Sequence, residues 1–186
     1  MIKGGKGGGN TKTGLLFEGE TDLIRFLDAQ PGYCVKRDVV YYENEEVARV
    51  FQKHGLYRFL DENGVEWKGV LSKRLLPDNC LYVIVNNTLF IIEVKFQEVS
   101  GSVDEKLQTC AFKKQQYQKL LSRANIDVEY VYLLSNWFRK PEYKDVLDYI
   151  ISVGCHFYFE YIPLTRFGLP VPEITEHHEQ QETPPC

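Results

Sequence analysis

Apolar and polar positions in the first third of the chain predict a helix, a strand and then a helical segment. Leu16, Leu23 and Leu27 share one face of a helix expected over residues 15–29, which Pro31 and Gly32 end. The further elements expected in this part are a strand over 33–42, a helix over 45–62 and a short helical stretch over 67–71.

The second half of the chain has a sharper pattern, which predicts a β-hairpin followed by a long helix. Two β-rich runs at 81–85 and 89–97 flank Asn86-Asn87, a pair of residues typical of turns. Ser102 and Glu105 have the spacing of a helix capping box, and the helix that they open is expected to continue to about residue 121. A strand over 128–134, a helix over 141–151 and a final strand over 156–162 complete the prediction.

This order of elements predicts an α/β protein with a mixed β-sheet flanked by helices. The long helix joins the second hairpin strand to the strand at 128–134, and a crossover of this kind makes two strands parallel. At 186 residues the chain is long enough for one domain with a hydrophobic core. The expected parts are a flexible basic arm over 1–13, a single domain over 14–172 with an insertion at 43–76, and an acidic tail over 173–186.

Charge does not exclude a nucleic-acid partner, although the formal net charge is −4. The tail carries four glutamates and no Lys or Arg, so the body over 1–172 is neutral and can still contain a basic cleft. No apolar run approaches the ~18 residues of a membrane helix. The N-terminal lysines precede no apolar stretch. We therefore expect a cytoplasmic protein with no membrane partner.

Two charges interrupt the apolar run of the second hairpin strand. Glu93 and Lys95 are two residues apart, so they project from the same face, whereas Val94 between them faces the other way. Charges on a buried strand cost desolvation free energy, which a partner must offset. The pair is either a salt bridge at the end of the strand or part of a functional site.

Asp78 favours a functional site. It opens the first hairpin strand, and antiparallel pairing brings the start of that strand beside the end of the second, where Glu93 lies. Two carboxylates and a nearby backbone carbonyl form the all-oxygen ligand set that suits Mg²⁺. Without a cation the two carboxylates would repel each other.

Pro77-Asp78, fourteen residues and then Glu93-x-Lys95, on a hairpin that precedes a crossover helix, resemble the PD-(D/E)xK nuclease superfamily. Further segments at 10–14, 17–18, 72–74 and 101–106 resemble type II restriction endonucleases of bacterial restriction–modification systems, and the resemblance extends over about residues 4–172. It implies a restriction-endonuclease-like fold with an αβββαβ core and a helical insertion.

The resemblance implies that the chain is a Mg²⁺-dependent hydrolase, with Mn²⁺ able to substitute. The reaction would hydrolyse phosphodiester bonds of double-stranded DNA at a specific sequence, leave 5′-phosphate ends and be carried out by a homodimer. Asp78, Glu93 and the Val94 carbonyl would hold the metal. Lys95 would orient or deprotonate the attacking water, or stabilise the phosphorane.

A further carboxylate is expected from the first helix, as in many members of the superfamily. The family-like spacing selects Glu18, whereas the helical face selects Glu20, and both stay candidates. Gln97 lies one step beyond Lys95 on the same face and is either a contact to the scissile phosphate or a strand-end residue. A related subgroup carries Gln-x-x-x-Tyr in the crossover helix, but this chain has Lys113-x-x-x-Tyr117 and does not match it.

Several basic side chains are candidate DNA contacts, each with a solvated surface cation as the alternative. They are Lys12, Lys73, Arg74, Lys106, Lys113 and Lys114. Two other functions stay open: a junction-resolving or repair endonuclease built on the same core, and a DNA-binding module without activity.

Overall fold

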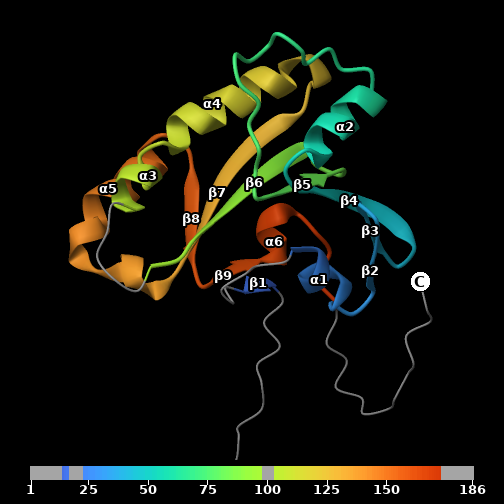
Figure 1. Ribbon diagram of the computed structural model, residues 1–186. Helices are drawn as coiled ribbons and strands as arrows, with labels where there is room; N and C mark the ends of the chain where they lie inside the picture. The colour runs from blue at the N-terminus through green and yellow to red at the C-terminus, as the bar shows by residue number, and fades with distance from the viewer. Residues whose placement is uncertain (1–13, 17–22, 98–102, 173–186) are drawn as a thin grey trace, which may run out of the picture.

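A seven-stranded mixed sheet with helices on both faces forms the centre of the computed structural model, which describes residues 14–16, 23–97 and 103–172 (Figure 1). The strand order is β2-β3-β4-β5-β6-β7-β8. These strands are β2 (Tyr33–Lys36), β3 (Val39–Tyr42), β4 (Glu45–Phe51), β5 (Asn79–Val83), β6 (Thr88–Lys95), β7 (Asp127–Leu134) and β8 (His156–Phe159). A second, two-stranded sheet pairs β1 (Gly14–Leu16) with β9 (Tyr161–Pro163).

The mixed character of the sheet is confirmed. From β2 to β6, each strand pairs antiparallel with the next strand along the chain. In contrast, β6 pairs parallel with β7, and β7 pairs parallel with β8. Helices provide the crossovers that parallel pairing requires. These are α3 (Val103–Leu107) and α4 (Cys110–Leu121) between β6 and β7, and α5 (Lys144–Ser152) between β7 and β8.

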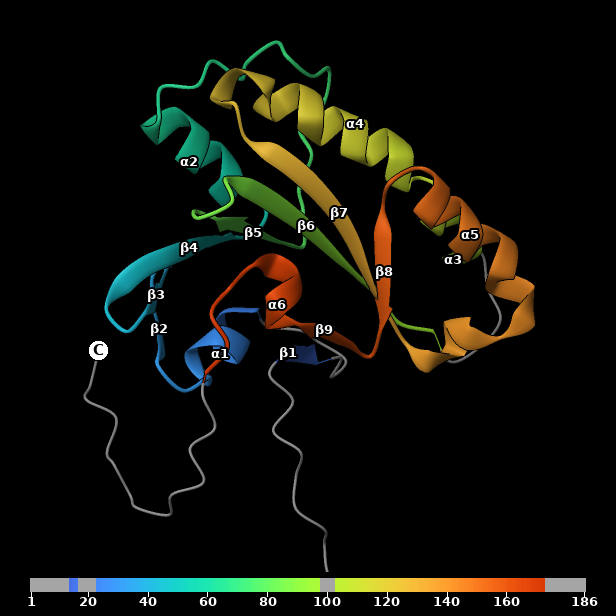
Figure 2. The ribbon, with the colours of Figure 1, turned by 180° about the vertical axis from the view of Figure 1, so that it is seen from behind.

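Each face of the sheet has its own hydrophobic core. Helices α4, α5 and α2 (Gly55–Glu62) cover one face, and α1 (Leu23–Asp28) and α6 (Leu164–Phe167) cover the other (Figure 2). Side chains of successive strand residues point to opposite faces, so Leu133 and Leu134 of β7 are fully buried in different cores. The run Leu89–Ile92 of β6 is apolar and buried, which makes the charge on the next residue, Glu93, stand out.

Two predicted elements at the N-terminus are wrong, the first because a distant strand pairs with it and the second because a turn divides it. The first part of the helix expected over 15–29 is strand β1, whose backbone pairs with residues 161–163 far along the chain. Helix α1 forms only its last part, and residues 17–22 lie outside the described residues. The strand expected over 33–42 is two strands, joined by a turn in which Arg37 has φ = 60°.

The helix expected over 45–62 is half strand. Residues 45–51 form β4, which lies in the sheet between β3 and β5, and only 55–62 form helix α2. Apolar Val47, Val50 and Phe51 fit the spacing of a helix, but pairing on both edges satisfies more backbone groups of this segment. The stretch 67–71 contains turns and a bend rather than a helix.

The second half of the prediction is largely confirmed. The hairpin, the long helix and the strand at 128–134 appear as β5–β6, α4 and β7. The helix expected from 141 starts as a 3₁₀ helix (Pro141–Tyr143) before α5, and Glu160, at φ = 61°, divides the last expected strand into β8 and β9. Two further 3₁₀ helices (Ser122–Ala124 and Asn136–Arg139) flank β7. Ser102 of the expected capping box lies outside the described residues.

Helix length also bears on the expected absence of a membrane partner. None of the described helices combines the length and the apolar composition that crossing a bilayer requires.

Candidate active site

The candidate site lies at one end of the central strands of the sheet, where β5 begins and β6 and β7 end. The last pair of the hairpin is Asn79 with Ile92, and Asp78 and Glu93 are the residues that come next to this pair on the two strands. Asp78 is exposed, whereas Glu93 is buried. Tyr117 of α4 lies near both: burial raises the pKa of its hydroxyl, and the charges of Glu93 and Asp78 raise it further.

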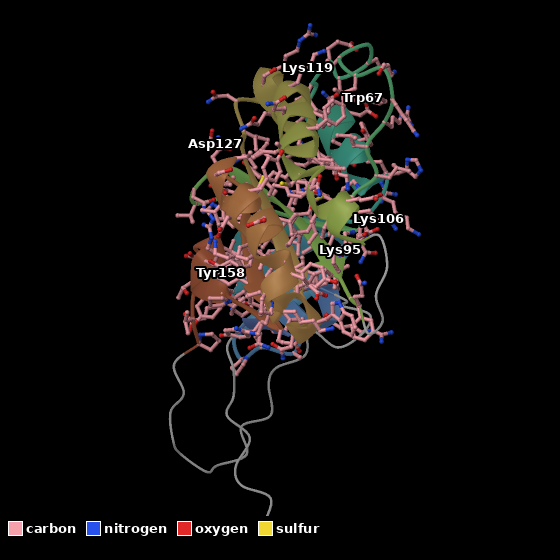
Figure 3. All side chains as sticks on the ribbon, turned by 90° about the vertical axis from the view of Figure 1, so that its left-hand side faces the viewer. Trp67, Lys95, Lys106, Lys119, Asp127 and Tyr158 are labelled. Carbon is pink, nitrogen blue, oxygen red and sulfur yellow. The ribbon has the colours of Figure 1, made fainter. Side chains whose placement is uncertain are left out.

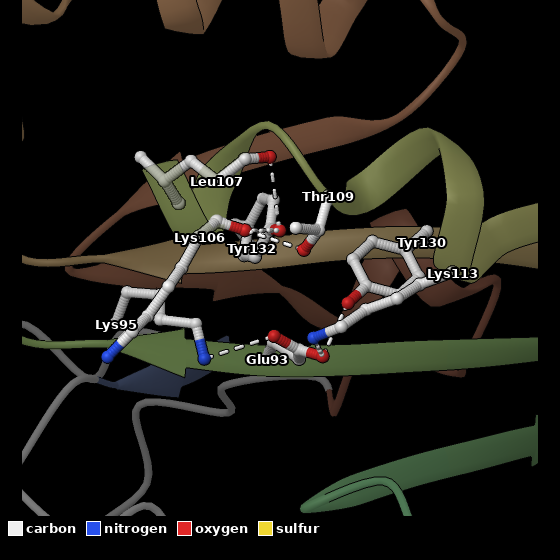
Figure 4. A network of polar contacts seen from close by, with 8 residues as sticks. All are labelled: Glu93, Lys95, Lys106, Leu107, Thr109, Lys113, Tyr130 and Tyr132. Atoms are coloured by element: carbon white, nitrogen blue, oxygen red, sulfur yellow. Dashed lines mark hydrogen bonds and ion pairs between the residues drawn. The ribbon is translucent and has the colours of Figure 1, made fainter. Parts of the chain in front are cut away.

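Glu93 is the centre of a network of polar contacts (Figure 4). Its Oε1 accepts a hydrogen bond of 2.6 Å from Lys113 Nζ and another from the Tyr130 hydroxyl. Its Oε2 lies 3.0 Å from Lys95 Nζ, an ion pair without hydrogen-bond geometry. Among the residues that the structure describes, this buried oxygen accepts no hydrogen bond. One oxygen of Glu93 is therefore held firmly, and the other has unused acceptor capacity.

The protonation state of Glu93 follows from these contacts. Burial by itself raises the pKa of the carboxyl, because the charged form is poorly solvated. The charge of Lys95 and the hydrogen bonds from Lys113 and Tyr130 outweigh burial, so the net effect lowers the pKa. Glu93 is thus an anion at neutral pH, and it forms ion pairs with both lysines.

Tyr130 is a member of the site that the sequence did not identify. It lies on β7 and is fully buried, and burial together with the charge of Glu93 raises the pKa of its hydroxyl, which therefore stays protonated as a donor. The parallel register pairs Ile91 with Tyr130 and Glu93 with Tyr132. Tyr130 and Tyr132 are two residues apart on a predicted strand, so their side chains share one face. This pattern could have indicated hydroxyl groups near Glu93, had the strand been placed beside β6.

Tyr132 attaches the start of the crossover to the sheet. Its hydroxyl lies 3.3 Å from the carbonyl oxygens of both Lys106 and Leu107, at the end of α3. Thr109 Oγ1 also donates to the Lys106 carbonyl, at 2.7 Å. These contacts set where α4 begins, and hence where Lys113 reaches the site.

The donor set fits a hard divalent cation that keeps several waters. Asp78 and Glu93 provide two carboxylates, and the buried Oε2 of Glu93 has acceptor capacity that no described residue uses. Val94 follows Glu93 on β6 and is half-buried. Within the described ranges no group of three His, Cys, Asp or Glu side chains gathers. Glu18 and Glu20, the candidates for a further carboxylate, lie outside those ranges.

Gln97 lies just beyond the end of β6 and is buried. Its backbone N–H donates to Ser135 Oγ at 3.4 Å, and Ser135 Oγ donates to the Gln97 carbonyl at 3.4 Å. These contacts join the ends of β6 and β7. They agree with the interpretation of Gln97 as a strand-end residue, while contact with a phosphate stays a prediction.

The predicted DNA contacts divide by their surroundings. Lys113 pairs with Glu93, and Lys114 donates to the Gly154 carbonyl at 2.6 Å, near the end of α5. The guanidinium of Arg74 lies over the Trp67 ring at 4.5 Å. Lys73 and Lys106 are exposed, and Lys12 lies outside the described residues. Figure 3 shows Lys95 and Lys106 on the same part of the molecule, with Lys119 at the far end of α4.

Comparison of the chain with protein-family models, curated proteins and solved structures found no match.

Proposed function

We propose that this chain is a metal-dependent endonuclease of the type II restriction class, which hydrolyses phosphodiester bonds of double-stranded DNA at a specific sequence and leaves 5′-phosphate ends. One observation carries the proposal: Asp78 and Glu93 are the residues next to the last pair of the hairpin, Asn79 with Ile92, and Lys95 Nζ lies 3.0 Å from Glu93 Oε2. Two carboxylates and a lysine at one end of these strands can together bind a cation and a phosphate.

Different side chains of the site would bind the metal and activate the attacking water. Asp78, Glu93 and the Val94 carbonyl would hold Mg²⁺, or Mn²⁺ in its place, which when bound supplies Lewis-acid stabilisation of developing charge. Lys95 would orient the attacking water or take up its proton. Tyr130 holds Glu93 in one orientation through the hydrogen bond to Oε1. Preorganised charge of this kind is the main contribution that a protein makes to phosphoryl-type chemistry.

Lys113 adds a second cation at the carboxylate. It donates to Glu93 Oε1 at 2.6 Å and is about one-third exposed. From this position its ammonium favours the ionised form of Glu93 and adds positive charge beside the place proposed for the scissile phosphate.

A digest with matched variants tests the proposed function. Unmethylated plasmid and bacterial genomic DNA are incubated with the chain and Mg²⁺, with EDTA, and with Asp78→Ala, Glu93→Gln, Lys95→Ala and the distant control Lys119→Ala. Wild type and Lys119→Ala should produce discrete fragments that EDTA abolishes, and the three site variants should lose at least about 100-fold in rate. Sequencing the fragment ends then identifies the recognition sequence. Equal nicking by wild type and Glu93→Gln would contradict the proposal.

A homodimer is part of the proposal, because two such sites related by a twofold axis can cut both strands of a duplex in one binding event. Sedimentation of the chain on a cleavable duplex in Ca²⁺ should give two chains per duplex. One chain per duplex together with single-strand nicks would contradict it.

A DNA-binding module without activity is the second candidate, and the Glu93 contacts favour it specifically. Two ammonium groups and a hydroxyl already surround the carboxylate, so its charge is balanced without a metal. This candidate predicts sequence-specific binding of duplex DNA that Mg²⁺ does not alter and no cleavage at any metal concentration. The same digest, run beside a binding assay, separates the two.

A further inference from the structure

A hollow of about 680 Å³ opens at the same end of the strands as the candidate active site. The turn between β2 and β3, the end of β4 and helix α2 form its walls. Val50 and Phe51 contribute an apolar part, and Arg37, Lys53 and Arg58 contribute three cationic groups. The hollow thus brings together cations from three separate segments of the chain.

The three cations have no ion-pair partner among the residues that the structure describes. None of them forms an ion pair or a side-chain hydrogen bond with a residue that the structure describes. Two acids also line the hollow, but Asp38 lies 3.8 Å from Arg49, and Glu62 is at the last turn of α2. Three cations and two acids thus line the hollow, and none of the three cations is held by an ion pair to a described residue.

Two of these cations lie on unusual backbone. Arg37 has φ = 60° and Lys53 has φ = 49°, in the left-handed region that side chains other than glycine seldom adopt. Such a conformation costs about 1–2 kcal/mol per residue. Strain of this kind clusters at ligand-binding segments.

The hollow is continuous with the candidate active site. Lys53 N–H donates to the Pro77 carbonyl at 2.9 Å, and Gln52 Nε2 donates to Asn79 Oδ1 at 3.0 Å. These two contacts bracket Asp78. The sheet order puts β4 two strands from β6 and β3 three strands from β6. Neighbouring strands lie ~4.8 Å apart, so the hollow is roughly 10–15 Å from Glu93 when measured across the strands.

The geometry points to a binding site for the phosphodiester backbone of the DNA strand, about three to four nucleotides from the phosphate to be cut. Phosphates of one strand recur every ~3.4 Å along a DNA axis, so a distance of roughly 10–15 Å corresponds to that number of nucleotides. Guanidinium groups match the two free oxygens of a phosphate, and an ammonium adds a point charge. This inference rests on the proposed function and assigns to it the surface that positions the substrate.

The test measures binding without cleavage. Anisotropy of a labelled duplex is titrated in Ca²⁺ over a series of salt concentrations, for wild type, Arg37→Gln, Lys53→Gln and Arg58→Gln. Lys119→Gln removes the same charge from the last turn of α4, which lies away from Lys95 and Lys106 (Figure 3), and serves as the control. Circular dichroism checks that each variant is folded, and Arg58, exposed on α2, provides a variant that leaves the strained turns intact.

Each hollow variant should lower the slope of log K against log salt by about 0.9 and weaken binding about fivefold at 0.15 M salt, regardless of DNA sequence. Lys119→Gln should bind like wild type. If wild type binds and cuts DNA and folded Arg58→Gln and Lys53→Gln keep its slope, the inference is overturned and the proposed function stands. If wild type binds no duplex at all, the proposed function fails, and this inference fails with it.

Discussion

Glu93 is a buried charged side chain, and burial of its charge costs desolvation free energy. Glu93 is 8% exposed, and two ammonium groups and one hydroxyl contact its carboxylate. Removing one member of a buried charged group leaves the others uncompensated, and this costs more than the net contribution of the intact pair. Substitutions in this network should therefore affect stability as well as function.

The hydroxyl of Tyr130 should have a measurable share in that balance. Tyr130→Phe removes the donor to Glu93 Oε1 and keeps the ring, so it should lower the free energy of unfolding by about 1.5–3 kcal/mol, as for hydrogen bonds to charged groups. Tyr132→Phe is the matched control on the same strand face, because its hydroxyl reaches only neutral carbonyls at 3.3 Å. Urea denaturation measures both. Equal losses would show that the charge on Glu93 is not what Tyr130 stabilises.

The lowered pKa of Glu93 predicts a pH-dependent contribution to stability. The folded pKa lies below that of the unfolded chain, which is about 4.3. Ionisation of Glu93 therefore stabilises the fold above about pH 4.3, and this contribution is lost as the pH falls through the folded pKa.

Glu93→Gln keeps the shape of the side chain and removes the titration. The difference in unfolding free energy between wild type and the variant should be largest near pH 7 and should shrink below about pH 4. Urea denaturation at a series of pH values measures it. A difference that grows on acidification would mean that the pKa is raised, contrary to the structure.

At the scale of elements, the β5–β6 hairpin sets the geometry of the site. Its register determines which residue faces Glu93, and a slip of one residue would move every side chain to the other face. The connection at the far end of the hairpin holds that register. Asn87, at φ = 50°, accepts a hydrogen bond from the Tyr82 hydroxyl and donates one to the Asn125 carbonyl.

Substitutions at Asn87 should separate backbone strain from side-chain bonding. Asn87→Ala loses both hydrogen bonds and puts an alanine on left-handed backbone, so it should cost about 2–3 kcal/mol of stability. Asn87→Gly loses the same bonds but tolerates the backbone, and it should cost about 1 kcal/mol. Thermal or urea denaturation compares the two. If the glycine variant were the less stable one, backbone strain would not explain the choice of Asn.

Predictions from sequence were best for elements that local chemistry determines. The Asn-Asn turn and two β-rich runs located the hairpin, and the strand and helix that follow were confirmed within a few residues. Strand β4 was missed because the spacing of Val47, Val50 and Phe51 fits either structure, and only its two neighbouring strands decide between them. Strand β1 was missed for the same reason, since its partner is about 145 residues away.

At the scale of the whole molecule, one sheet separates two hydrophobic cores. Strand β7 lies between β6 and β8 and contributes fully buried side chains to both cores. Because both cores depend on the same strand, the described domain should unfold as one cooperative unit.

Two alanine substitutions in β7 test that cooperativity. Leu133→Ala and Leu134→Ala each leave a cavity in a different core, and each should cost about 2–5 kcal/mol. Trp67 and Trp137 lie on the side of Leu134, so their fluorescence reports one core while circular dichroism reports the whole sheet. For both variants the two probes should show a single transition. A Leu133→Ala variant that shifts only the dichroism would indicate cores that unfold separately.

The sequence by itself determined the hairpin and the face shared by Glu93 and Lys95. These follow from turn residues and from the two-residue period of a strand, which act over short distances along the chain. Only the tertiary structure decided that Lys113 and Tyr130 hold Glu93 and that β4 belongs to the sheet. Those contacts join segments that are distant in sequence, and they depend on how the crossover helix packs, which no local pattern encodes.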